Sequence, residues 1–205
     1  MYIPAHFSAT PETVQQLLAR PGAANLVTMT ADGLLATLVP FAYNPDVGDH
    51  GALQGHLARN NSQWSEPAVG EALAIIQSAD AYVSPSWYAS KAEHGRVVPT
   101  WNYTTIHVYG RLVVHDHPEW LSSQVRRLTG LHEADFSHPW SVDDAPERFI
   151  AGQLRAIVGI ELVITRIEAK AKLSQNRPAA DIDGVVAGLS GAGHAAAAAD
   201  VERAR

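Results

Sequence analysis

The apolar and polar positions of this chain fall into short strand patterns, one of which alternates with a period of two over residues 52–59, and these patterns predict a fold dominated by β-strands. The patterns cover residues 25–30, 34–41, 52–59 and 72–76. Ala31-Asp32-Gly33 separates the first two runs and predicts a hairpin, because glycine accepts a positive φ in the turn. The run 72–76 is continuously apolar, so we expect both of its faces to be covered.

The two longest strand patterns come later in the chain. One runs from Trp101 to His115 and the other from Val158 to Leu173. Apolar positions in the second pattern change parity between residues 164 and 167, which predicts a β-bulge there. Residues 84–99 are expected to form a long loop rich in aromatic and polar groups, and loops of this kind often carry function.

Helix signals stand beside the strands rather than between them in regular alternation. They begin at Thr10-Pro11, at His117-Pro118 (through about residue 128), at Ala145-Pro146 (through about residue 157) and at Pro178 (through residue 189). This order predicts a mainly β fold, an antiparallel sheet or small barrel with peripheral helices. We expect one domain over residues 1–189 and an Ala-rich C-terminal tail over 190–205, either a frayed helix or disordered.

Composition narrows the class of protein. The 205 residues include no cysteine, which excludes disulfides, thiolate metal sites and cysteine nucleophiles. No apolar run approaches the roughly 20 residues of a membrane helix, and the N-terminus lacks signal-peptide features, so we expect a cytoplasmic protein without a membrane partner. The net charge of −6 disfavours a protein that coats nucleic acid.

Common catalytic and metal-binding motifs are missing from the sequence. It contains no phosphate-binding Walker loop, dinucleotide fingerprint or nucleophile elbow. His132-Glu133 is not followed by a histidine at position 136, and the ten histidines match no known ligand spacing. We therefore predict no metal site and assign no catalytic residue.

Residues 54–110 combine aromatic side chains with cations and hydroxyl groups. Trp64, Trp87 and Trp101 lie here together with Arg59 and Lys91. A phosphate binds to Arg, Lys and hydroxyl donors, whereas a flat heteroaromatic ring needs apolar faces and a few directed hydrogen bonds. FMN has both parts. The alternative, that the aromatics are core or interface residues and the cations are solvated, is equally compatible with composition alone.

Five short motifs stand in the order found in a known family. They are GHLARNN at 55–61, SPSWY at 84–88, VPTWNY at 98–103, VYG at 108–110 and KLSQNR at 172–177. With these motifs the chain resembles, from residue 1 to about 189, the PaiB family, described as FMN-binding negative transcriptional regulators. The resemblance implies a split β-barrel related to the pyridoxamine-phosphate-oxidase-like flavoproteins, a homodimer with FMN sites between its subunits, and a role in repressing genes.

In and beside these motifs, the resemblance implies three groups of FMN-binding residues. The predicted phosphate-binding residues are Arg59, Ser84, Ser86 and Lys91. Those predicted for the ring and the ribityl chain are Trp87, Tyr88, Trp101 and Asn102. Those that follow the last strand and could close the site from one subunit are Lys172, Ser174 and Gln175.

Two other functions are compatible with the same fold. One is a flavin-dependent oxidoreductase, or a haem-handling protein, acting on an unknown small molecule, because a bound cofactor supplies the difficult chemistry. The other is a repressor that binds DNA directly. The negative charge and the absence of a recognition-helix signature disfavour direct DNA binding, so regulation could instead pass through a metabolite or a partner protein.

Overall fold

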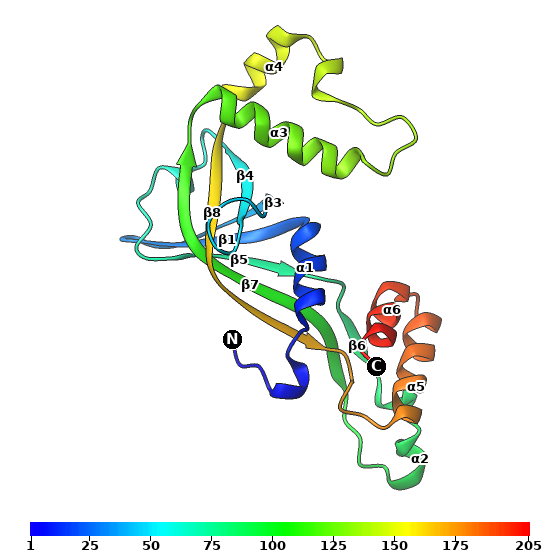
Figure 1. Cartoon of the computed structure of the whole chain (residues 1–205). Helices are drawn as coiled ribbons and strands as arrows, with labels where there is room; N and C mark the ends of the chain where they lie inside the picture. The colour runs from blue at the N-terminus through cyan, green and yellow to red at the C-terminus, as the bar shows by residue number, and fades with distance from the viewer. The chain divides into compact units, whose positions relative to one another are not determined.

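Eight strands form one sheet in the computed structural model, which describes residues 1–205 (Figure 1). Their order is β2-β1-β5-β7-β8-β4-β3, with β6 beside β7. The strands are β1 (Ala23–Thr30), β2 (Gly33–Pro40), β3 (Ala42–Asn44), β4 (Ala52–Ala58), β5 (Ala72–Gln77), β6 (Ala81–Val83), β7 (Thr100–His115) and β8 (Ile157–Lys172). The pairs β1–β2, β1–β5, β3–β4, β4–β8 and β6–β7 are antiparallel, which confirms the predicted mainly β fold.

Six α-helices accompany the sheet. They are α1 (Pro11–Ala19), α2 (Ser90–His94), α3 (Pro118–Glu133), α4 (Glu147–Leu154), α5 (Ala179–Gly191) and α6 (Ala195–Arg203). The four helices predicted from the sequence begin at or next to the predicted residues. However, α3 runs past residue 128 and α4 ends before residue 157. The predicted loop 84–99 is less irregular than expected, because it contains a 3₁₀ turn, η3 (Pro85–Trp87), and helix α2. None of the helices is long and apolar enough to span a membrane.

The chain divides into two compact units. The first unit contains residues 1–14, 77–106 and 169–205, and the second contains residues 15–76 and 107–168. Strands β7 and β8 each contribute residues to both units.

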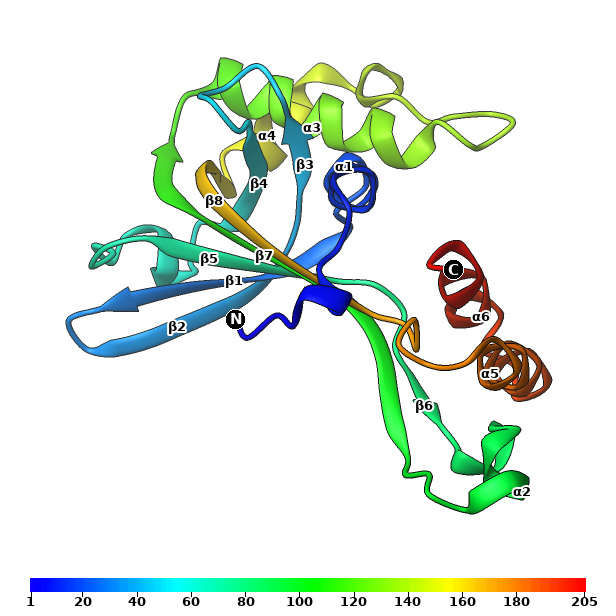
Figure 2. The same cartoon turned by 60° about the horizontal axis from the view of Figure 1, so that its bottom comes forward.

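The second unit is built on the β1–β2 hairpin, β5, β4 and most of β7 and β8, with α3 packed against β3 and β4 (Figure 2). On β4, the sequence pattern placed Gln54 and His56 on a polar face. Helix α3 buries Gln54 on this face and leaves His56 partly buried, and each side chain has a polar partner. The Gln54 amide donates to Glu161 at 2.7 Å, and a His56 ring nitrogen pairs with Gln124 of α3 at 2.9 Å.

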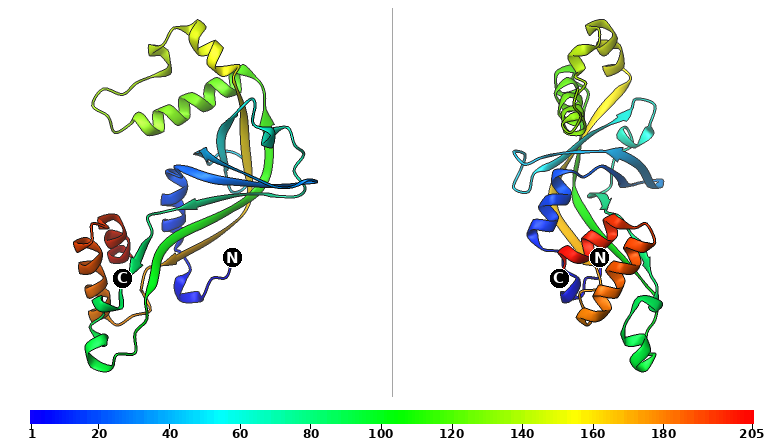
Figure 3. Two further views of the ribbon diagram at one scale, coloured as in Figure 1. Left: turned by 180° about the vertical axis from the view of Figure 1, so that it is seen from behind. Right: turned by 90° about the vertical axis from the view of Figure 1, so that its right-hand side faces the viewer.

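The first unit has a core of its own, in which α5 and α6 lie side by side (orange and red in Figure 3). This core contains Val185 and Leu189 of α5. It also contains Val83 of β6, Tyr88 after η3 and Leu173 after β8. The Ala-rich segment forms helix α6, and Ala197, Ala198 and Val201 are buried in this core. The apolar face of α6 explains this burial, because it covers side chains of α5 that would otherwise face water.

Candidate functional site

A tight turn after β8 holds the residues of the KLSQNR motif. Ser174 has a φ of 65°, and it is the one non-glycine residue with a positive φ in the chain. Its hydroxyl and the amide of Asn102 form two hydrogen bonds of 3.0 and 3.1 Å, and both side chains are buried. Gln175 folds back, accepting from the Leu173 N–H at 2.7 Å and donating to the Ala171 carbonyl at 2.6 Å. A non-glycine residue with a positive φ, such as Ser174, persists only where several contacts hold it, and such residues are common at binding sites.

Three cations lie on or beside this turn without a carboxylate partner. Lys172 donates to the Thr100 hydroxyl and, at 2.6 Å, to the Trp101 carbonyl. Lys170 lies 5.6 Å from the centre of the Tyr103 ring, and the Arg177 guanidinium lies 4.6 Å from that of Tyr88. Burial lowers the pKa of Lys172, and the nearby positive charges of Lys170 and Arg177 lower it further.

An exposed aromatic pair lies on the same part of β7. Trp101 is 53% exposed, and its ring meets that of Tyr82 edge to face at 6.1 Å. Tyr82 and Trp101 are register partners across β6 and β7, so their side chains share one face of the sheet. Their neighbours Ala81 and Val83 point to the other face, into the α5–α6 core.

Trp87 and Tyr88, predicted for the flavin ring, are packed by α5, and the Tyr88 ring also lies against the Arg177 guanidinium. Tyr88 is buried in the core, and Trp87 packs against it. Gly184 and Gly188 of α5 face Trp87 so closely that a Cβ at either position would overlap its carbonyl oxygen or its indole ring. These two aromatic side chains therefore stabilise the first unit.

The predicted phosphate residues divide between the two units. In the first unit, the Ser84 hydroxyl caps η3 by accepting from the Ser86 N–H at 3.2 Å, and Lys91 donates to the Ser86 hydroxyl at 3.1 Å. Arg59 belongs to the second unit. Its guanidinium donates to both oxygens of Asp116 at 2.5 and 3.1 Å and to two backbone carbonyls, so its donors already have partners.

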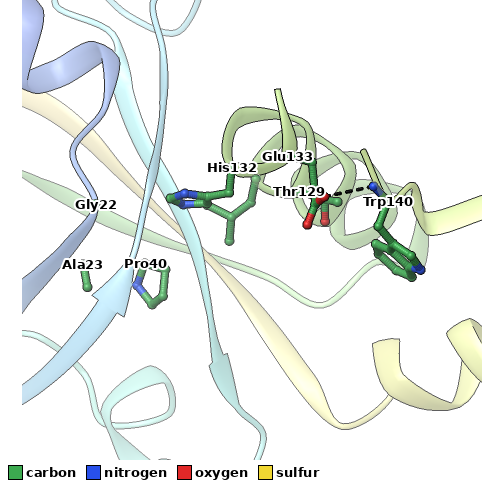
Figure 4. Close-up of a pocket in the computed structure, with 8 residues that line it drawn as sticks. Gly22, Ala23, Pro40, Thr129, His132, Glu133 and Trp140 are labelled. Carbon is green, nitrogen blue, oxygen red and sulfur yellow. Dashed lines mark hydrogen bonds between the residues drawn. The ribbon is translucent and has the colours of Figure 1, made fainter. Parts of the chain in front are cut away.

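A surface hollow of about 490 Å³ in the second unit contains none of the predicted residues (Figure 4). Its lining is Gly22, Ala23, Pro40, Leu128, Thr129, His132, Glu133 and Trp140. Figure 4 shows His132 directed toward the strands, whereas Trp140 lies away from them. The Glu133 carboxylate accepts from the Trp140 N–H at 2.9 Å, so its acidic group is engaged in holding the rim.

Comparison with known families identifies the chain. Residues 1–166 match the family described as "Putative FMN-binding domain". The chain belongs to this family. It is also 31% identical, over 188 residues that cover 91% of this chain and 87% of the other, to the Bacillus subtilis "Protease synthase and sporulation protein PAI 2", a PaiB protein. The resemblance to the PaiB family is thus confirmed, and FMN is the cofactor of the family to which the chain belongs.

Solved structures confirm the split-barrel fold. A conserved hypothetical protein from Mycobacterium tuberculosis matches with a TM-score of 0.60 at 12% identity, covering 87% of this chain and 94% of the other. An "FAD and Heme binding protein" from Mycobacterium smegmatis matches with a TM-score of 0.51 at 17% identity, covering 80% and 72%. At these identities the likeness extends to the fold alone.

The donor set of the first unit fits FMN, the cofactor of this family. Cations without carboxylate partners suit a phosphate, and the exposed Tyr82–Trp101 pair offers an apolar surface to a flat ring. The sequence-based prediction missed Tyr82, Lys170 and Arg177. The period-two spacing of Lys170 and Lys172 was a usable signal for one of them, because residues two apart on a strand share a face.

Proposed function

We propose that this protein binds FMN as a homodimer, with the flavin between subunits, and regulates transcription as the PaiB family resemblance implies. The observation that supports the flavin part best is the exposed Tyr82–Trp101 pair beside Lys170 and Lys172. When bound, FMN supplies redox chemistry at its ring. The chain's own residues bind and orient it: the aromatic pair covers the ring, and the cations attract the phosphate.

Replacing Trp101 with alanine is expected to weaken FMN binding about tenfold, because the ring loses a stacking surface. Binding is measured by quenching of flavin fluorescence on titration of the apoprotein with FMN. Trp140→Ala is the matched control, because Trp140 is 45% exposed but lines the hollow of the second unit. If only Trp140→Ala lost binding, the flavin site would be assigned to that hollow. A protein that takes up no FMN would refute the flavin proposal.

An apolar face on the second unit supports the homodimer. Alternating residues of β2, β1 and β5 point outward together, as their register pairs require. This outer apolar face consists of Ala23, Val27, Met29, Leu34, Ala36, Leu38, Pro40, Leu73 and Ile75. Leu34 and Leu38 are 67% and 62% exposed, and the polar members of these rows are Asn25 and, at the end of β5, Gln77. A contiguous apolar face of this kind marks an interaction surface, and a second copy of the chain suits it.

A charge in the middle of the outer apolar face is expected to abolish the dimer. Leu38→Asp should shift the protein from dimer to monomer in sedimentation velocity, because a buried unpaired carboxylate strongly disfavours association. FMN binding should fall with it if the flavin lies between subunits, although the residues of the first unit are unchanged. Leu38→Ala keeps the face apolar and serves as the control. A monomeric variant with full FMN affinity would contradict the inter-subunit position.

The regulatory part is proposed to act indirectly. A net charge of −6 opposes autonomous binding to the phosphate backbone of DNA, so we expect no electrophoretic shift of the gene's own promoter fragment at low salt, with or without FMN. Transcript levels in a deletion strain should still change. A tight, salt-dependent shift by the protein alone would instead favour a repressor that binds DNA directly.

A further inference from the structure

We propose that Lys170, Lys172 and Arg177 form a binding site for a phosphate group at the end of β8. The three cations come from the last strand and the turn that follows it. The site goes beyond the proposed function, because the phosphate could belong to FMN or to a separate ligand. It rests on the proposed function only in the first case.

The cluster brings together, within residues 170–177, three of the chain's cations that form no ion pair with a carboxylate. The chain is acidic overall, and six of its arginines pair with carboxylates within 4.0 Å: Arg20, Arg59, Arg126, Arg166, Arg203 and Arg205. Lys170, Lys172 and Arg177 make no such pair. Asp181 interacts electrostatically with Arg177, but it is only 1% exposed, and its hydrogen bonds come from Ser90. The positive charge of the cluster is therefore open to a ligand.

The direct contacts of the three cations are with neutral groups, although Arg177 also attracts the buried Asp181 carboxylate electrostatically. Lys172 is fixed by two oxygen acceptors, the Thr100 hydroxyl and the Trp101 carbonyl, both of them neutral. Lys170 and Arg177 rest on the faces of Tyr103 and Tyr88. Like charges placed together disfavour one another, and a doubly charged phosphate relieves that repulsion for all three.

The turn is organised in advance of any ligand. The Ser174 backbone adopts its left-handed conformation because the Asn102 side chain binds its hydroxyl from both directions. The Arg177 N–H then donates to the Ser174 carbonyl at 2.9 Å, which places the arginine relative to Lys172. The Arg177 guanidinium lies over the Tyr88 ring, 4.6 Å from its centre, and this contact fixes the position of the arginine further. A turn maintained against its conformational preference, presenting cations, is a device for binding an anion.

Inorganic phosphate titrated into the full-length protein tests the site directly, with calorimetry or NMR shifts as the readout. Lys170→Gln, Lys172→Gln and Arg177→Gln should each weaken phosphate binding about tenfold, the usual effect of losing one charged donor. Lys172→Arg should retain most of the affinity because it keeps the charge. Arg96→Gln removes an exposed cation of the same unit outside the cluster and should change nothing. Circular dichroism confirms that each variant is folded. No phosphate binding by the wild type, or an equal loss in Arg96→Gln, overturns the site.

Parallel titrations with FMN and riboflavin identify the source of the phosphate. If it belongs to FMN, inorganic phosphate competes with FMN, and the glutamine variants weaken FMN but not riboflavin. If it belongs to a separate ligand, inorganic phosphate and FMN bind together, and the same variants leave FMN affinity unchanged. Both results support the site. Failure of the proposed function is seen separately, as a protein that takes up neither flavin while it still binds phosphate.

Discussion

Gly184→Ala is expected to lower the free energy of unfolding by about 3 kcal/mol, the upper range for overpacking a core. A Cβ at this position of α5 would overlap the backbone carbonyl oxygen of Trp87. A backbone atom cannot turn away as a side chain can, so α5 or the segment around η3 has to shift. The close contact between this segment and the helix thus depends on a residue without a side chain.

Two further glycines of α5 provide graded controls for this prediction. At Gly188 a Cβ would overlap the Trp87 indole, a side chain that can move, so Gly188→Ala should cost less than Gly184→Ala. At Gly191 a Cβ meets nothing within 4 Å, and Gly191→Ala should stabilise the protein by at most about 1 kcal/mol through helix propensity. Urea unfolding followed by circular dichroism gives the three values. Equal effects at all three positions would show that the contact with Trp87 does not limit packing.

The strands could be predicted from sequence where a local pattern determined them. The hairpin of β1 and β2 follows from two strand-forming runs separated by Asp32-Gly33, and the structure pairs Thr30 with Gly33 across that turn. Strand β6 was missed because three residues are too few to show a period. On β8, the predicted bulge stays a prediction; Ile160 and Leu162 are buried in the second unit, and Ala171 in the first.

Composition could not separate site residues from core residues within one motif. In SPSWY, Trp87 and Tyr88 look like ring-binding aromatics, yet their surroundings are set by glycines of α5 nearly a hundred residues later in the chain. Trp101 carries the same chemistry, but it lies on the face of β7 opposite the core and stays exposed. Only tertiary packing distinguishes the two cases, because burial depends on residues that are distant in sequence.

The sequence of β5 predicts more burial than the structure of one chain shows. The apolar run 72–76 predicted a strand covered on both sides, but Leu73 and Ile75 are only partly buried. The uncovered side belongs to the outer apolar face that we propose as the dimer interface. A partner subunit on this face would bury the side of β5 that one chain leaves open.

Asp181→Asn is expected to destabilise the protein by about 2 kcal/mol at neutral pH, because the amide has one acceptor oxygen instead of two and no charge to strengthen the bonds from Ser90. One oxygen accepts from the Ser90 N–H at 2.9 Å and the other from the Ser90 hydroxyl at 2.7 Å. These bonds join the first turn of α5 to the start of α2, so the loss should loosen the region around α2 first. Hydrogen exchange of the amides of residues 90–94 measures that local effect.

The dependence of stability on acidic pH provides a second test of the bonds between Asp181 and Ser90. Burial alone raises the pKa of Asp181, but the two Ser90 donors, helped by the positive charge of Arg177, outweigh it and hold the pKa below its usual value. A carboxylate whose pKa is lowered by folding stabilises the folded state fully above its unfolded pKa of about 3.9. That stabilisation disappears as the pH falls through the lower, folded-state pKa. Asp181→Asn should therefore flatten the loss of stability below about pH 4.

Asp183→Asn removes an exposed carboxylate, paired with Arg205, from the same helix and should cost less than about 1 kcal/mol. If both variants gave the same acid profile, the buried bond to Ser90 would not be the source of the effect.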